Sequence, residues 1–452
     1  MYGASAYAGA LTQASESARS DACSAVDRGE VATTKRLPRG ERRRNRFGSR
    51  QGPLAEPPAN LRCVNRRDAL DPFPWYERMR HRSPVLRDEA SGVWMVFGFD
   101  DVRTALSDHN RFSSDFSRLS GGDRSGLGAS VISTDPPRHR QLRGLVTQAF
   151  TPRAVEALRP RIEEIVDELL DGVEERGELD VVQDLAYPLP VIVIAEMLGI
   201  PSADRARFKR WSDDVVAPPS GLDDIELTSA HYEMGAYFVE LLNKRRGDPR
   251  EDLISALLAA EIEGERLSEI ELVGFCMLLL VAGNETTTNL IANAVLCFDQ
   301  YPAAEAAVRS NLQLLPSAIE EVLRYRSPVQ SMFRVTTEPV ELSGMVIPQD
   351  QQVVAWIGSA NRDPAQFPSA DSFQVERLPN RHLAFGHGIH FCLGAPLARL
   401  EARIVLAALF ERLGELQVDS GTPLEALPGT IVYGVKSLPV TFDPRAPVAG
   451  TS

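Results

Sequence analysis

The feature that most constrains this chain is one very long helical pattern in its second half. Residues Leu267 to Asp299 predict a single helix with an apolar centre. The longest apolar run, Leu272 to Ala282, is shorter than the roughly 20 residues that are needed to cross a bilayer. We therefore expect no membrane span.

Shorter helices and strands are predicted on both sides of this helix along the chain. Apolar residues recur at helical spacing over 153–176, and further helices are predicted at 204–216, 317–326 and 396–413. Two apolar runs around Glu89-Ala90-Ser91-Gly92 predict a β-hairpin, and short strands are predicted at Val340–Leu342, Met345–Ile347 and Val353–Ile357. Helix dominates, so we expect a mainly α fold with small β-sheets.

Composition narrows the class of protein. Of the 452 residues, 43% are hydrophobic and 25% are charged, which is ordinary for a soluble globular protein. The net charge of −13 argues against nucleic acid as a partner, because phosphate binding needs clustered Lys and Arg. The five cysteines are scattered and show no CxxC spacing, which argues against a disulfide framework and favours the reducing cytoplasm.

Residues 1–55 differ from the rest of the chain. They are rich in Ala, Ser, Gly and Arg, and they include a basic run from Lys35 to Arg50. We interpret them as a disordered extension, with a docking arm for an acidic partner or membrane surface as the alternative. The ordered domain is expected at 56–445, followed by a short tail at 446–452.

The densest chemistry surrounds Cys392, which comes just before a predicted helix. Backbone N–H groups at a helix start and the positive end of its dipole both favour a thiolate. Pro396 suits the first turn of that helix. Gly386 and Gly388 allow a tight loop and a close backbone approach to a flat ligand.

The residues around Cys392 leave three interpretations open. The cysteine could be buried and inert, or it could bind haem through its thiolate. It could also bind zinc together with His387 and His390. Zinc usually needs the other half of a paired motif, and the chain has no second Cys/His cluster.

The long helix carries a second candidate for chemistry. Ala282 and Gly283 are small residues that open space beside the helix for a flat cofactor and a diatomic ligand. Glu285 and Thr286 place an acid next to an alcohol, a pair that can pass protons to bound dioxygen. A solvated pair at a helix kink is the alternative.

The stretch from Phe385 to Gly394, FGHGIHFCLG, closely resembles the haem-binding loop of the cytochrome P450 family. Further motifs follow in the family's order between residues 65 and 443. The resemblance implies the P450 fold, a single large domain, with haem b as cofactor and Cys392 as the ligand of its iron. It also implies haem contacts from Phe385, Gly386, His390, Gly394, Ala282 and Gly283.

The resemblance also assigns roles to the acid and the alcohol. Glu285 would relay protons, and Thr286 would hold the reduced oxygen species beside the iron. This pair argues against the two rival functions, a peroxide-driven peroxygenase and a haem-binding sensor or carrier without turnover. The expected enzyme is a monooxygenase that uses dioxygen.

Two further groups of residues match family motifs. Glu321 and Arg324 lie three apart on one helix face, and by resemblance Arg377 is their third partner in a structural cluster. Haem propionates need cations. The residues that the resemblance assigns to them are His139, Arg143, Arg334 and His390.

The expected substrate is a hydrophobic small molecule such as a macrolide or other polyketide, a fatty acid, a terpenoid or a steroid. By resemblance, its pocket is lined by Leu279, Val329, Met332, Phe333, Ile431 and Val432. The chain has no flavin or iron–sulfur module, so electrons are expected from a separate ferredoxin and ferredoxin reductase. Candidate contacts for the donor are Arg138, Arg140, Arg399 and Arg403.

Overall fold

The computed structural model describes residues 70–443, except 121–129, 148–149, 205–206, 209, 212–228, 262–263 and 265. The chain divides into residues 1–56 and 57–452, and only the second unit contains described residues. The predicted extension at 1–55 and the tail at 446–452 therefore lie outside the described part.

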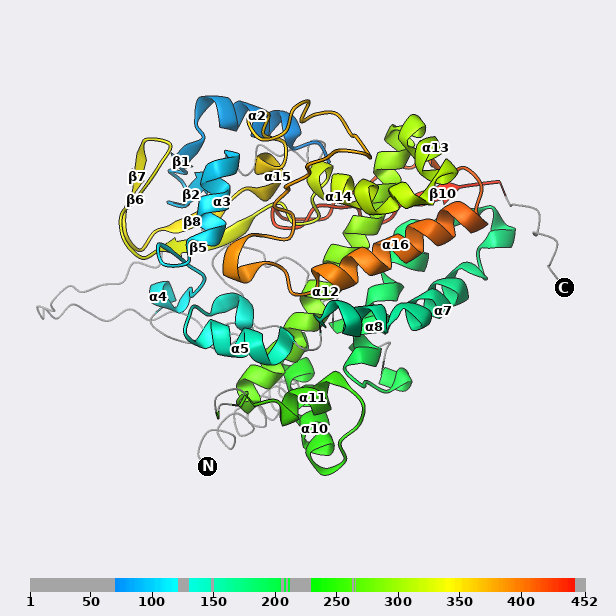
Figure 1. Cartoon of the computed structure of the whole chain (residues 1–452), viewed down its shortest axis with the longest axis horizontal. Coiled ribbons are helices and arrows are strands. Elements are labelled where there is room, and N and C mark those ends of the chain that lie inside the picture. Colours follow the sequence, from blue (N-terminus) through cyan, green and yellow to red (C-terminus); the bar gives the residue numbers. More distant parts are fainter. Residues whose placement is uncertain are drawn as a thin grey trace, which may run out of the picture. The chain divides into compact units, whose positions relative to one another are not determined.

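The described chain is mainly helical, as predicted (Figure 1). The first helices are α2 Phe73–Arg82, α3 Phe99–Ser107, α4 Ser117–Ser120, α5 Arg138–Thr147, α6 Pro152–Glu156, α7 Arg159–Leu170 and α8 Pro188–Met197. They are followed by α10 Ser229–Gly247, α11 Leu253–Ala259, α12 Glu269–Gln300, α13 Pro302–Ser310, α14 Leu315–Tyr325, α15 Ile357–Ala360 and α16 Ala395–Arg412.

Helix α12 is the long helix that the sequence predicts. It begins at a capping box, in which Ser268 and Glu271 satisfy each other's backbone N–H groups. It packs against α8, α10, α14 and α16, and Figure 1 shows it passing through the middle of the helical part. By length and composition α12 could cross a membrane, with a mean hydropathy of 1.4, yet half of that stretch is buried inside the protein.

Three small sheets accompany the helices. The largest has the order β1-β2-β8-β5-β3, another has the order β4-β10-β9, and β6 pairs with β7. Their strands are β1 Val85–Arg87, β2 Trp94–Val96, β3 Phe112–Ser113, β4 Glu178–Asp180, β5 Met332–Thr336, β6 Val340–Leu342, β7 Met345–Ile347, β8 Gln352–Ala355, β9 Gln417–Val418 and β10 Pro439–Thr441. The predicted hairpin is present as β1 and β2, with Val85 opposite Val96.

The prediction of one helix over 153–176 is wrong. The segment forms α6 and α7, which are separated at Ala157 and Leu158. Pro160 explains the break, because it has no N–H to donate to the carbonyl of Glu156 four residues earlier. After Leu170 the chain turns into a short 3-10 helix, and Gly177 ends it with a φ of 69°.

Most apolar side chains gather into one large core among the helices. It includes buried residues of α7, α8, α10, α12, α14 and α16. Two smaller clusters pack at the large sheet, one with Trp94 and Val353 and the other with Met95 and Val354. Because neighbouring residues of a strand point to opposite faces, the sheet carries a different cluster on each face.

Candidate functional site

Cys392 lies between the 3-10 turn Gly388–His390 and the start of α16, and its side chain is accessible. Its backbone N–H donates to the Phe385 carbonyl at 2.8 Å, which closes the loop. Burial among the surrounding protein atoms raises the pKa of the thiol, although the N–H groups of Gly394 and Ala395 act against that rise. The N–H groups at the helix start thus favour the thiolate, as the sequence predicts, but burial has the larger and opposite effect on the pKa.

The glycines of this loop permit its close packing. Gly386 and Gly388 have φ values of 74° and 73°, which favour glycine. A Cβ on Gly388 would lie 2.8 Å from the Cα of Ser107 in α3. Gly388 therefore makes a close backbone approach to helix α3, and its predicted approach to a flat ligand stays a prediction.

A zinc site at Cys392 finds no support in the described part of the chain. No group of three His, Cys, Asp or Glu side chains there could hold a metal ion. His387 is exposed, whereas the ring of His390 packs on that of His139. The two histidines that the zinc interpretation needs thus have different environments.

A cluster of histidine and arginine side chains lies beside the loop. The rings of His139 and His390 are 4.3 Å apart, and neither Nε2 atom has a hydrogen-bond partner among the described residues. Burial, together with neighbouring cations, lowers the pKa of His139 to about 4 and that of His390 to about 3. Burial also lowers the pKa of Arg334 to about 10. An anionic group fits here, because it would pair with groups that are otherwise costly to bury.

Two further residues complete this cluster. Arg143 donates from Nη2 to the carbonyl of Phe391 at 2.7 Å, one residue before Cys392. His109 was not predicted, but its charge contributes to the lowered pKa values of both His139 and His390. It is an isolated histidine in the sequence, so only the folded chain identifies it.

Helix α12 presents the second half of the site. Ala282 is exposed although this part of the helix lies in the core, so the space predicted beside it is present. Thr286 donates from Oγ1 to the carbonyl of Ala282 at 2.7 Å. Burial raises the pKa of Glu285 to about 7, so this carboxyl can hold or release a proton near neutral pH.

Gly283 packs closely against a neighbouring helix. A Cβ on Gly283 would lie 2.4 Å from Cδ1 of Ile194 in α8. The missing side chain therefore makes room for the packing of α12 on α8, and space for a cofactor beside Gly283 stays a prediction. The rotation of α12 about its own axis decides this, and tertiary packing sets that rotation.

The predicted structural cluster is assembled behind the loop. Glu321 accepts two hydrogen bonds of 2.8 Å from Arg324, and both of its oxygens lie 3.1 Å from Nε of Arg377. Arg324 also donates to the carbonyl of Asn361 at 2.9 Å, and the Asn361 side chain accepts from the N–H of Leu383 at 2.7 Å. These contacts connect the buried ion pair to the start of the Cys392 loop.

Apolar residues of the predicted pocket come from three separate segments. Val329 and Val432 form an isolated β-bridge, which brings two of these segments together. All six predicted residues are partly or fully exposed, namely Leu279, Val329, Met332, Phe333, Ile431 and Val432. Phe333 points to the opposite face of β5 from Met332, so Met332 packs partly against the cluster of Trp94 and Val353, and Phe333 packs partly against the cluster of Trp75 and Trp356.

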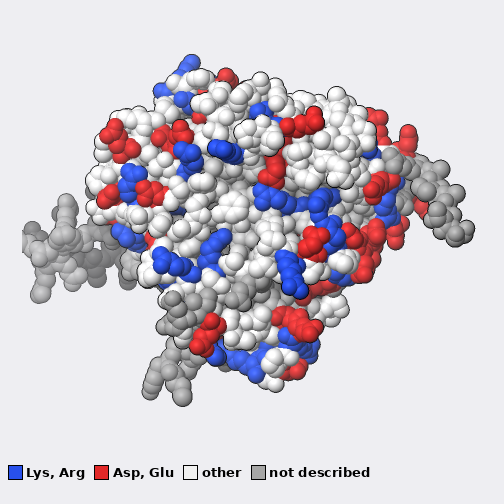
Figure 2. Space-filling model, in the orientation of Figure 1, with Lys and Arg blue, Asp and Glu red and all other residues white. Residues whose placement is uncertain are grey.

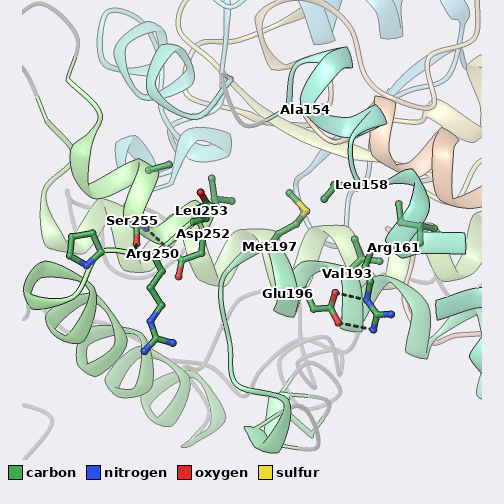
Figure 3. Close-up of a pocket in the computed structure, with 14 residues that line it drawn as sticks. Ala154, Leu158, Arg161, Val193, Glu196, Met197, Arg250, Asp252, Leu253 and Ser255 are labelled. Carbon is green, nitrogen blue, oxygen red and sulfur yellow. Dashed lines mark hydrogen bonds and ion pairs between the residues drawn. The ribbon is translucent and has the colours of Figure 1, made fainter. Parts of the chain in front are cut away.

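A different pocket of about 650 Å³ lies among α6, α7, α8 and α11 (Figure 3). Arg161 and Glu196 form a two-point ion pair on one side of it, with distances of 3.0 and 3.1 Å. None of the predicted site residues lines it. We do not assign the catalytic site to this pocket.

Two of the four predicted donor contacts are already paired within the protein. Arg138 forms a two-point ion pair with Glu271, and Arg399 forms one with Glu320. Arg140 is exposed, and Arg403 is partly buried. Figure 2 shows basic side chains over α5 and along α16 on one face of the protein, and acidic ones toward α7.

The fold and these residues define a class of protein. A mainly helical domain places an accessible cysteine near a cluster of His and Arg side chains, and its longest helix carries an acid and an alcohol. This combination fits a haem whose iron binds the cysteine and whose propionates pair with the cations. The class is that of haem-thiolate proteins.

Comparison with known proteins gives the family. The profile of the family described as Cytochrome P450 matches residues 85–214 and 230–439. The protein named putative cytochrome P450 YjiB from Bacillus subtilis is 45% identical over 389 residues, which cover 84% of this chain and 96% of that protein. Cytochrome P450 monooxygenase PikC from Streptomyces venezuelae is 43% identical, with 87% and 97% covered.

Solved structures agree with the family. Substrate-free CYP109E1 from Bacillus megaterium superposes with a TM-score of 0.78 at 45% identity, covering 82% of this chain and 98% of that one. The chain belongs to the cytochrome P450 family. It is a monooxygenase with haem b as its cofactor, so the fold, cofactor and class of reaction predicted from the sequence are confirmed.

Proposed function

We propose that this monooxygenase hydroxylates a hydrophobic small molecule of the size of a polyketide, macrolide, terpenoid, steroid or fatty acid. The observation that carries the proposal is the set of accessible apolar side chains that the β-bridge of Val329 and Val432 brings together. A relative that is 40% identical is named erythromycin C-12 hydroxylase, and a structure of CYP109E1 contains testosterone. Both names support a large apolar substrate and a place in secondary or lipid metabolism.

Within the site, Cys392 would hold the haem iron, and the loop from Phe385 to Gly394 would support it. The propionates would bind His139, Arg143, Arg334 and His390. When bound, haem supplies the iron that activates dioxygen. Glu285 would deliver protons, and Thr286 would orient them toward the reacting oxygen from the helix face that carries Ala282.

Electrons would come from a separate ferredoxin and its reductase in the cytoplasm. An acidic donor would dock over α5 and α16, where Arg140 and Arg403 lie. Arg138 and Arg399 contribute less, because Glu271 and Glu320 already neutralise them. Weaker donor binding in Arg140→Gln, with unchanged substrate binding, would support this docking face.

A ligand screen followed by turnover tests the proposal. Steroids, macrolides and fatty acids are titrated against the ferric protein, and the spin-state shift of the haem reports binding near the iron. Bound compounds are then incubated with NAD(P)H, ferredoxin and reductase, and we expect a product that carries one added oxygen atom. The absence of any shift and any product across the panel would contradict the proposed substrate class.

The variant Thr286→Ala separates the proposed enzyme from its two rivals. We expect it to bind the same ligands but to release peroxide in place of product, because the alcohol no longer orients proton delivery. Product formation from peroxide alone, equal in the wild type and the variant, would indicate a peroxygenase. Ligand binding without any product in the wild type would indicate a sensor or carrier.

A further inference from the structure

Arg138 and Glu271 join two helices that are distant in sequence. Arg138 is the first residue of α5, and Glu271 lies in the first turn of α12. Nε of Arg138 donates to Oε1 of Glu271 at 2.8 Å, and Nη2 donates to Oε2 at 2.7 Å. Two parallel hydrogen bonds fix the orientation of both side chains, whereas a single contact would not.

Glu271 has a second partner in the capping box of α12. Its Oε2 atom accepts from the backbone N–H of Ser268 at 2.9 Å and from the hydroxyl of Ser268 at 2.8 Å. Burial would raise the pKa of Glu271, but the hydrogen bonds from Arg138 and Ser268 lower it below its ordinary value. The Glu271 carboxylate is therefore held in place at the start of α12, where it binds Arg138 of α5.

The same short helix also contacts the cysteine loop. α5 is 10 residues long, and its second residue, His139, packs on the ring of His390. Its sixth residue, Arg143, donates to the carbonyl of Phe391, next to Cys392. One rigid helix thus touches the start of α12 at one end and the loop of the iron ligand along its length.

We propose that the Arg138–Glu271 pair is a latch that positions α5 against the cysteine loop, and through it His139, Arg143 and Cys392. Arg138 and Glu271 are positioning residues, since neither is placed at the haem. The inference rests on the haem site described above. It assigns Arg138 to internal positioning and not to contact with the electron donor.

Arg138 could position α5 or contact the electron donor, and these two roles predict different results for the variants Arg138→Gln and Glu271→Gln. Arg138→Gln removes a positive charge and Glu271→Gln removes a negative one, while the Gln side-chain oxygen can still close the capping box. If the pair is a latch, either change breaks it, so both variants should change the properties of the haem in the same direction. A long-range charge effect on the haem or on donor docking has opposite signs in the two variants.

The experiment uses the full-length holoprotein and three readouts. These are the fraction of the reduced carbon monoxide complex that keeps its thiolate ligand, the reduction potential, and the peroxide released per NAD(P)H. We expect both variants to shift the potential in the same direction and to raise the peroxide yield about two- to fivefold, as expected for loss of a partly buried pair. The double variant should be no worse than the worse single variant.

Two controls isolate the latch. Arg153→Gln makes the same charge change at an exposed position of α6, and we expect it to leave the potential and the peroxide yield near the wild-type values. Ser268→Ala weakens the capping box but leaves the ion pair in place, so it should behave in the same way. Shifts of opposite sign in the two latch variants, or no shift in either, would overturn the proposal. A wild-type protein without the thiolate signal would instead refute the haem site itself.

Discussion

The rings of His139 and His390 lie 4.3 Å apart, and the Nε2 atoms of both lack a hydrogen-bond partner among the described residues. The nearby Arg334 is also buried, and its charge contributes to lowering the pKa of His390. Buried imidazole nitrogens without a hydrogen-bond partner, next to a buried arginine, are costly unless a ligand completes them. This pair therefore marks where the haem propionates are expected to bind.

His390→Ala should weaken haem binding. Loss of a hydrogen bond to a charged group costs about 1.5–3 kcal/mol. When this whole cost appears in the barrier to haem release, the release rate rises about 10- to 150-fold. The transfer of haem to an excess of an acceptor protein measures that rate. His387→Ala serves as the control, because His387 lies in the same loop but is exposed. Equal rates in the two variants would remove His390 from the propionate site.

The coupling of electrons to product should fall as pH rises through about 7. Burial raises the pKa of Glu285 to about 7, so its carboxyl is protonated below that pH and can donate, and it is ionised above. Glu285→Gln should flatten the profile and slow turnover by about 100-fold, within the range for loss of a general acid. Product formed per NAD(P)H, measured against pH, gives the profile. A variant that keeps the wild-type profile would show that another group supplies the proton.

Glu321→Gln should destabilise the fold strongly. Arg324 is fully buried and would be left with an uncompensated charge, which costs about 3–5 kcal/mol. The free energy of unfolding in urea measures the loss. Glu164→Gln is the control, because its pair with Arg161 is exposed and should cost at most about 1 kcal/mol. Similar losses in both variants would contradict the structural role of Glu321.

Glu401→Gln should stabilise the protein at high pH. Glu401 in α16 is 1% exposed, and its Oε1 atom has no partner among the described residues. Burial raises its pKa from 4.5 to about 8, so the folded chain keeps a proton that the unfolded chain releases between those values. Folding stability therefore falls as pH rises from 4.5 to about 8, and the neutral variant avoids this loss.

Urea unfolding of both proteins across that pH range measures the effect. We expect the two curves to agree near pH 4.5 and to separate by on the order of 4 kcal/mol near pH 8. Glu415→Gln changes an exposed carboxyl of the same region and should follow the wild type. Parallel curves for Glu401→Gln and the wild type would show that the Glu401 carboxyl is solvated.

Much of the fold follows from local signals in the sequence. The long helix was predicted at 267–299 and is found at Glu269–Gln300, because the capping box of Ser268 and Glu271 marks its start. The last helix was predicted at 396–413 and is found at Ala395–Arg412, with Pro396 in its first turn. Signals of this kind lie within one turn of the residue that they specify, so they can be read without the fold.

Features that depend on orientation could not be predicted in this way. Gly283 and Ala282 are neighbours, yet one packs on Ile194 and the other is exposed, because tertiary packing sets the rotation of α12. Met332 and Phe333 are also neighbours in sequence, but they lie on opposite faces of β5 and pack against different clusters. Arg138 and Glu271 are 133 positions apart, so their pairing has no local signal.

The spectrum of the reduced protein with carbon monoxide tests the central claim most directly. Cys392 as the iron ligand predicts the strongly red-shifted Soret band of a thiolate-ligated haem in the wild type. Cys392→Ser should bind haem through the same propionate contacts but lose that band. A wild type that binds haem without the band, or a Cys392→Ser variant that keeps it, would contradict the account.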